Sequence, residues 1–162
     1  MRAFCLILAV FVLLAPSVAR AEEAAPQQAA PEEPYGIALE GFPYPYPVHL
    51  LPIVHEGEKL RMAYMDVAPK GDANGRTVLL LHGRNFPSSY WRSVIEKLAA
   101  AGYRVIAPDQ IGFNKSSKPA FDLHFDQLAR NTEALLDELK IGKVSIVGHS
   151  MGGMLSVRLT RM

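Results

Sequence analysis

From Thr77 onward, short apolar segments alternate with segments of helical periodicity, and this alternation limits the fold more than any other feature of the sequence. Thr77–Leu81 and residues 103–107 and 143–147 have the length and continuous hydrophobicity of strands buried on both faces of a sheet. A strand–helix–strand order with short connections produces parallel strands joined by right-handed crossovers. The sequence therefore predicts the α/β class, with a mostly parallel sheet and helices on both of its faces.

Two helices are expected between these strands. The first is expected to start at a cap on Ser88 or Ser89 and to stop at Gly102, and the second is expected to end at Gly142. Each has residues, apolar except for one threonine, at the three- and four-residue spacing that places them on one helix face. These residues are Trp91, Val94, Ile95 and Leu98 in the first helix, and Leu128, Thr132, Leu135, Leu136 and Leu139 in the second.

An antiparallel hairpin is expected ahead of the alternating elements. Residues 48–54 and 59–67 are rich in branched and aromatic side chains, and Glu56, Gly57 and Glu58 separate them. Before the hairpin, residues 42–47 alternate aromatics with prolines and are expected to be extended. We expect these aromatics to dock on the domain rather than on a ligand, because large rings bury wherever a surface is offered.

The N-terminus has the three parts of a secretory signal peptide. Arg2 is followed by an apolar run over residues 3–15 and by the small-residue cleavage site Ala19-Arg20-Ala21. The alternative, an uncleaved membrane anchor, needs about 20 apolar residues. We therefore expect residues 1–21 to be removed and the protein to be periplasmic or secreted, with no stable membrane span. Residues 22–34, made of Ala, Pro, Glu and Gln, are predicted to be a disordered linker.

Composition excludes several classes of function. The net charge is +1, which provides no basic field for nucleic acid. Cys5, the one cysteine, lies in the predicted signal peptide, so the mature chain would have neither a disulfide nor a thiolate nucleophile. No cofactor or metal is expected, and the expected partner is a small-molecule substrate.

A serine on a sharp turn is the strongest functional signal. Gly148, Ser150 and Gly152 form a G-x-S-x-G pattern between the third strand and an apparent helix. A serine hydroxyl must project toward a base to become a nucleophile, and a tight turn leaves no room for side chains at the two glycines. The alternatives are a turn without chemistry and a phosphate-binding loop, but the latter's lysine and spaced glycines are missing.

Three motifs together resemble the N-terminal half of the α/β-hydrolase fold family. They are the GHSMGG sequence at 148–153, the HGRNF sequence at 82–86 and the loop at 108–117, in the family's order and over residues 46–162. The resemblance implies that Ser150 is the nucleophile and that the backbone N–H groups of Met151 and Arg84 form the oxyanion hole. It also implies structural turns at His82, Gly83, Gly148 and Gly152.

Neighbouring residues are interpreted against the same resemblance. His82 is expected to orient its loop, and His149 is not assigned as the base because neighbours on a sharp turn diverge. Asp109 is expected to bond within its own loop, and Trp91 to pack in the core. The Arg84 side chain is a candidate for binding an anionic substrate. Asn114 stands where the family usually has glycine, which is expected to affect loop geometry more than mechanism.

The resemblance also narrows the chemistry. Relatives that open epoxides or displace halide use aspartate at the nucleophile position, so Ser150 indicates hydrolysis of esters, thioesters, amides, lactones or C–C bonds through an acyl-enzyme. In this family an acid and then a histidine follow the nucleophile. Residues 151–162 contain neither.

Three interpretations of that missing pair stay open. The chain is a fragment of an exported serine hydrolase whose domain, 35–162, is truncated after the nucleophile turn. Alternatively, it is a catalytically inactive binding or scaffold protein that retains the first half of the fold. A separate C-terminal chain that complements it is the third possibility.

Overall fold

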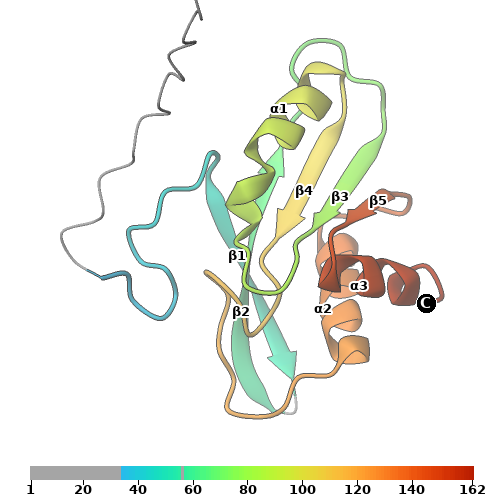
Figure 1. Ribbon diagram of the computed structural model, residues 1–162. Coiled ribbons are helices and arrows are strands. Elements are labelled where there is room, and N and C mark those ends of the chain that lie inside the picture. Colours follow the sequence, from blue (N-terminus) through green and yellow to red (C-terminus); the bar gives the residue numbers. More distant parts are fainter. Residues whose placement is uncertain (1–33, 56) are drawn as a thin grey trace, which may run out of the picture. The chain divides into compact units, whose positions relative to one another are not determined.

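The computed structural model describes residues 34–55 and 57–162, and a five-stranded sheet lies at its centre (Figure 1). The strands are β1 (Val48–His55), β2 (Glu58–Val67), β3 (Thr77–Leu81), β4 (Arg104–Pro108) and β5 (Ser145–Gly148), in the spatial order β1-β2-β4-β3-β5. The predicted signal peptide lies outside the described residues, and so does the predicted linker except for Pro34.

Strand pairing confirms the α/β class and the leading hairpin. β3 pairs in parallel with both β4 and β5, whereas β1 pairs with β2, and β2 with β4, in antiparallel orientation. The Arg104 guanidinium donates two hydrogen bonds to the Asp66 carboxylate across the β2–β4 junction, at 2.9 and 2.7 Å. These bonds raise the pKa of Arg104 further above its ordinary value. The junction joins the hairpin to the parallel part of the sheet.

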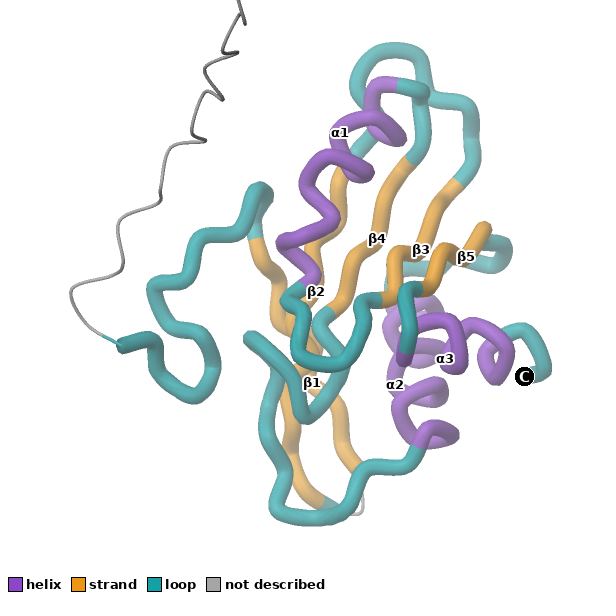
Figure 2. The backbone as a smooth tube through the Cα atoms, in the orientation of Figure 1, coloured by secondary structure: helices purple, strands orange, loops and turns teal. Residues whose placement is uncertain are grey.

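Helices cover both faces of the sheet, as predicted (Figures 1 and 2). A short 3-10 turn, η1 (Ser88–Trp91), leads into α1 (Arg92–Ala100) on one face. The other face carries α2 (Phe125–Glu138) and α3 (Met151–Leu159). The layers place the carboxyl ends of β3 and β5 side by side, because Leu81 pairs with Gly148.

Side chains of β3 alternate between two hydrophobic clusters, which explains its continuous apolar sequence. Val78 and Leu80 pack with the buried residues of α1, whereas Leu79 and Leu81 pack with those of α2 and α3. All four are buried. The first cluster includes Ile95 and Ala99, and the second includes Leu128, Leu135, Leu136, Met151 and Leu155.

The predicted helix boundaries need correction. Neither Ser88 nor Ser89 caps α1, because the residues form the preceding 3-10 turn and Trp91 is the cap position without a side-chain bond. Gly102 has a φ of 83° and follows the end of α1, as predicted. The predicted stop of α2 at Gly142 is wrong, because Lys140 adopts the left-handed conformation, with a φ of 55°. α2 begins at a capping box that joins His124 and Gln127.

The aromatic segment before the hairpin docks on the domain, as expected. Tyr44 and Tyr46 are partly buried against the cluster beneath α1. Phe42 makes edge-to-face ring contacts with Tyr35 and Tyr44, with centroids 5.2 and 6.1 Å apart. The packing of Tyr44 and Tyr46 attaches the segment to the domain, and the Tyr44 hydroxyl also bonds to Asp109, which directly follows β4.

β5 is the outer strand on one side of the described sheet. Val147 on this strand has 43% of its surface exposed. In the described residues, 34–55 and 57–162, no helix has the length and hydrophobicity needed to cross a membrane.

Candidate active site

Ser150 occupies a strained backbone position between β5 and α3. Its φ of 51° and ψ of −114° lie outside the regions that side chains with a Cβ normally adopt. Such strain persists only where the surrounding structure enforces it, and it is concentrated at functional sites. The turn leaves Ser150 exposed at the end of the strand. Among the described residues its hydroxyl makes no hydrogen bond.

The two glycines of the turn have steric reasons to be glycine. A Cβ on Gly152 would collide with the carbonyl of Leu81 at the end of β3, and a Cβ on Gly148 would collide with the backbone of Gly152. Gly153 is different, because the nearest atom to its Cβ position is 3.8 Å away. The first two glycines therefore allow α3 to start directly against the ends of β3 and β5.

The backbone N–H groups predicted to form the oxyanion hole lie at the two neighbouring strand ends. Met151 is the first residue of α3, where helical N–H groups have no partner within the helix. Arg84 lies in residues 82–87, here called the β3 loop, which continues β3. Within residues 57–162 neither N–H group donates a hydrogen bond. Their function in an oxyanion hole stays a prediction.

His82 is buried and fastens the β3 loop, as its predicted orienting role requires. Its Nε2 accepts a hydrogen bond from the Gln110 backbone N–H at 2.9 Å, so the proton resides on Nδ1, which donates to the Gly83 carbonyl at 2.7 Å. Burial lowers the pKa of His82 below its ordinary value. With both ring nitrogens occupied and the neutral form favoured, His82 has no free nitrogen with which to act as a base.

Asp109 does more than the predicted bonding within its own loop. It begins residues 109–118, here called the β4 loop, and it is fully buried. One carboxylate oxygen accepts from the Ser88 backbone N–H at 2.8 Å, and the other accepts from the Tyr44 hydroxyl at 2.6 Å and the Lys115 backbone N–H at 3.1 Å. The carboxylate therefore joins three segments of the chain.

Asn114 also reaches the β3 loop. Its φ of 51° is the left-handed conformation, which glycine adopts easily. This explains why the family that the motifs resemble usually has glycine at this position. Its side-chain amide donates to the Phe86 carbonyl at 2.8 Å and to Asp109 at 3.3 Å. Asparagine here thus preserves the backbone geometry and adds a contact to the β3 loop that glycine lacks.

His149 lies in an aromatic cluster beside the β3 loop. Its Nδ1 is 3.2 Å from the Tyr90 hydroxyl oxygen. Its ring centroid is 5.5 Å from that of Phe86 and 5.9 Å from that of Tyr90. A Cβ on Gly83 would lie 2.7 Å from the same Nδ1, so the ring lies against the β3 loop. The absence of a side chain on Gly83 makes this close approach possible.

No described histidine is hydrogen-bonded to Ser150. The five histidines of the sequence, His49, His55, His82, His124 and His149, all lie in the described part of the chain. The ring centroids of His49 and Tyr64 are 5.3 Å apart, the His55 ring hydrogen-bonds with the Gln127 amide, and His124 caps α2. Trp91, predicted in the core, is partly buried against the cluster beneath α1.

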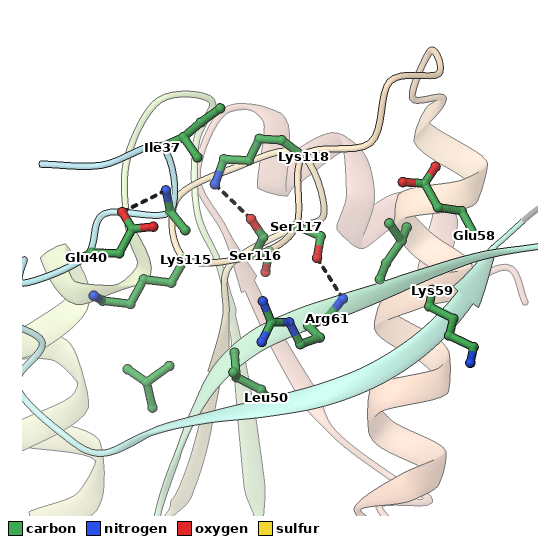
Figure 3. A pocket seen from close by; sticks show the side chains of 13 residues that line it. Ile37, Glu40, Leu50, Glu58, Lys59, Arg61, Lys115, Ser116, Ser117 and Lys118 are labelled. Carbon is green, nitrogen blue, oxygen red and sulfur yellow. Dashed lines mark hydrogen bonds between the residues drawn. The ribbon is translucent and has the colours of Figure 1, made fainter.

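A cavity of about 690 Å³ lies apart from the serine turn. The cavity is lined by Ile37 and Glu40 of residues 34–47, here called the N-terminal segment, by the β1–β2 hairpin and by the end of the β4 loop (Figure 3). Lys118 bonds to the carbonyls of Asn114 and Ser116, and burial lowers the pKa of Lys118. These bonds satisfy loop carbonyls, so the lysine stabilises the β4 loop.

The family model described as alpha/beta hydrolase fold matches residues 76–161, which is more than half of the chain. The chain belongs to this family. Haloalkane dehalogenase of Mycobacterium marinum is 34% identical to it over 120 residues, which is 72% of this chain and 39% of that protein.

Solved structures agree with the family assignment. A probable hydrolytic enzyme from Pseudomonas aeruginosa is 58% identical, with a TM-score of 0.76, over 78% of this chain and 40% of that one. An esterase from Thermogutta terrifontis is 27% identical, with a TM-score of 0.60, over 70% and 40% of the two chains. The chain thus spans about two fifths of the length of these relatives.

Proposed function

We propose that the protein is an exported serine hydrolase in which Ser150 attacks a carbonyl carbon and forms an acyl-enzyme. The observation that carries this proposal is the position of Ser150, which is exposed at a φ of 51° between two glycines, and a Cβ at either glycine would collide with backbone atoms. Strain of this kind has a functional explanation, because it aims a hydroxyl out of the sheet toward a substrate.

The nucleophile's chemistry favours acyl substrates over halides and epoxides. A carboxylate that displaces a halide or opens an epoxide forms an ester, and water then attacks the ester carbonyl to release the product. A serine would form an ether, which offers water no carbonyl carbon. The proposed substrates are therefore esters, thioesters, amides, lactones or ketones cleaved at a C–C bond. The activity named for the Mycobacterium marinum relative is not part of the proposal.

In the proposed reaction, negative charge develops on the carbonyl oxygen as the serine oxygen bonds to the carbon. The N–H groups of Met151 and Arg84 would donate to this oxygen, and loss of one such donor costs about 3 kcal/mol in transition-state stabilisation. The N-terminal end of α3 adds a favourable dipole at the same place. Within residues 34–55 and 57–162, no histidine is hydrogen-bonded to Ser150.

That last observation favours a second candidate function. A chain that folds without a base beside its serine would serve as a binding or scaffold protein, or would need a complementing chain to supply the acid and histidine. Removal of the triad base typically costs about a million-fold in rate, so the two candidates differ greatly in turnover.

A chimera separates the candidates. Residues 34–162 would replace the matching region of the Pseudomonas aeruginosa enzyme, whose 58% identity makes the graft structurally conservative. We expect hydrolysis of p-nitrophenyl butyrate and labelling by a fluorophosphonate probe, both lost in Ser150→Ala. Labelling that survives Ser150→Ala would refute the proposed nucleophile. Purified chain alone, assayed in parallel, shows whether it needs the added region.

Export is tested separately. If residues 1–21 are a signal peptide, the chain recovered from the periplasm or medium begins at Glu22. N-terminal sequencing of the recovered protein measures this directly, and a chain that retains Met1 in the cytoplasm contradicts the export proposal.

A further inference from the structure

The hydroxyl of Tyr44 reaches the buried carboxylate of a residue 65 positions later in the sequence. It donates to Asp109 Oδ2 at 2.6 Å. Burial, followed by the nearby Asp109 charge, raises the pKa of Tyr44 far above its ordinary value, so the phenol keeps its proton and remains the donor. A short hydrogen bond to a carboxylate is among the stronger polar contacts in proteins.

The same carboxylate holds the residue that follows the β3 loop. Asp109 Oδ1 accepts from the Ser88 backbone N–H at 2.8 Å, and both groups are buried. Ser88 is the first residue of η1, so this bond fixes the point where the β3 loop ends. His82, bonded to Gln110, fixes the point where it begins. The orientation of the Arg84 N–H between these points depends on both attachments.

Lys115 strengthens the link between the β4 loop and the N-terminal segment. Its backbone N–H donates to Asp109 Oδ2, its ammonium donates to the Leu39 carbonyl at 2.6 Å, and the ammonium lies 5.0 Å from the Tyr44 ring centroid. Figure 3 shows Lys115 and Glu40 on the same side of the cavity, beneath the N-terminal segment. The segment is therefore attached to the β4 loop at two points.

We propose that Tyr44 is a positioning residue for the β3 loop, acting through the Asp109 carboxylate. The proposal rests on the proposed function of that loop as half of an oxyanion hole. The N-terminal segment is then part of the catalytic architecture, although the matched family region begins only at residue 76. Without the phenol, Asp109 loses its shortest side-chain donor and holds Ser88 less rigidly, because bonds in a buried network depend on each other.

Tyr44→Phe is the direct test, with Tyr46→Phe as its matched control. Both tyrosines lie partly buried on the same segment, but within the described residues the Tyr46 hydroxyl makes no hydrogen bond. In purified full chain, we expect amide hydrogen exchange to be about five- to tenfold faster in Tyr44→Phe at Ser88 and at Phe86 of the β3 loop, whose N–H groups are hydrogen-bonded. Exchange at Leu135 in α2 should be unchanged, which excludes general destabilisation.

Kinetics in the chimera provide the second readout. We expect Tyr44→Phe to lower kcat about tenfold with KM unchanged, since a displaced oxyanion donor affects the transition state more than substrate binding. Tyr46→Phe should stay within about twofold of the parent. Unchanged exchange in the β3 loop, or faster exchange with unchanged kcat, would overturn the proposal. If the parent chimera does not react at Ser150, the proposed function fails, and the exchange result still decides whether Tyr44 holds the loop.

Discussion

The ring of His82 bridges two loops, because its Nε2 accepts the backbone N–H of Gln110 at 2.9 Å while its Nδ1 donates to Gly83. Only the neutral ring makes both bonds, since a protonated ring has no acceptor. Protonation of this one side chain therefore breaks one of the connections between the β3 and β4 loops, while the bond from Asn114 to the Phe86 carbonyl remains.

Stability should fall as the pH drops below about 6.5, the ordinary pKa of histidine. The folded-state pKa of His82 is lower than the unfolded-state value, so the unfolded chain binds more protons in this range and acid favours unfolding. Above pH 6.5 this contribution is fully present. Urea unfolding at pH 7.5, 6.5 and 5.5 measures the loss.

The matched variants are His82→Gln and His49→Gln. We expect the first to flatten the pH dependence over this range and the second, which changes an exposed histidine on β1, to leave it as in the parent. An equally steep profile in His82→Gln would show that other groups cause the acid sensitivity.

Alanine substitutions in the serine turn should have opposite effects at adjacent glycines. Gly152→Ala forces a Cβ into the Leu81 carbonyl and should destabilise the chain by about 3 kcal/mol or prevent folding. Gly153→Ala has ordinary contact distances inside α3 and should stabilise it by about 0.5 to 1 kcal/mol. Thermal unfolding of the two variants tests this, and equal effects would contradict the close approach of α3 to β3.

Ser150→Gly should be more stable than Ser150→Ala by about 1 kcal/mol, because glycine adopts a positive φ without steric cost. Neither variant retains the hydroxyl, so the comparison isolates the backbone strain from the loss of the side chain. Denaturant unfolding of the pair measures it. Alanine equal to or better than glycine would mean that the turn is not strained.

Two substitutions at Asn114 separate its backbone and side-chain contributions. Asn114→Gly keeps the left-handed conformation but loses the bond to the Phe86 carbonyl, which should cost about 1 kcal/mol. Asn114→Ala loses the bond and adds strain, for a total of about 2 kcal/mol. If the glycine variant matches the parent in urea unfolding, the contact to the β3 loop contributes nothing to stability.

Local patterns predicted the elements well where the physical cause is local. The strand Thr77–Leu81 is recognisable from its own run of apolar residues. In the structure its alternate side chains are buried in the two hydrophobic clusters, which explains why the run is continuous. Helix ends were predicted less well. The 3-10 turn at Ser88 forms where that residue's N–H is held by the distant Asp109, and the α2 stop falls on Lys140 although a glycine stands two residues later.

Motif residues of the site were identifiable for a similar reason. Gly148, Ser150 and Gly152 are close in sequence, and the structure supplies steric causes for the two glycines. The role of Tyr44 had no local signal, because its bond to Asp109 joins residues 65 positions apart. The side-chain bond of Asn114 to the Phe86 carbonyl has no local signal either, because it joins residues 28 positions apart that meet only in the folded chain.

The register of β3 with β5 also bears on how the chain folds. Leu81 pairs with Gly148, so everything from residue 82 to residue 147 must be spanned before the two strand ends meet. Closing so large a loop carries an entropic cost that neighbouring contacts such as the β1–β2 hairpin avoid. We therefore expect the surroundings of Ser150 to be among the last to become ordered, after the hairpin and the β3–α1–β4 unit are already in place.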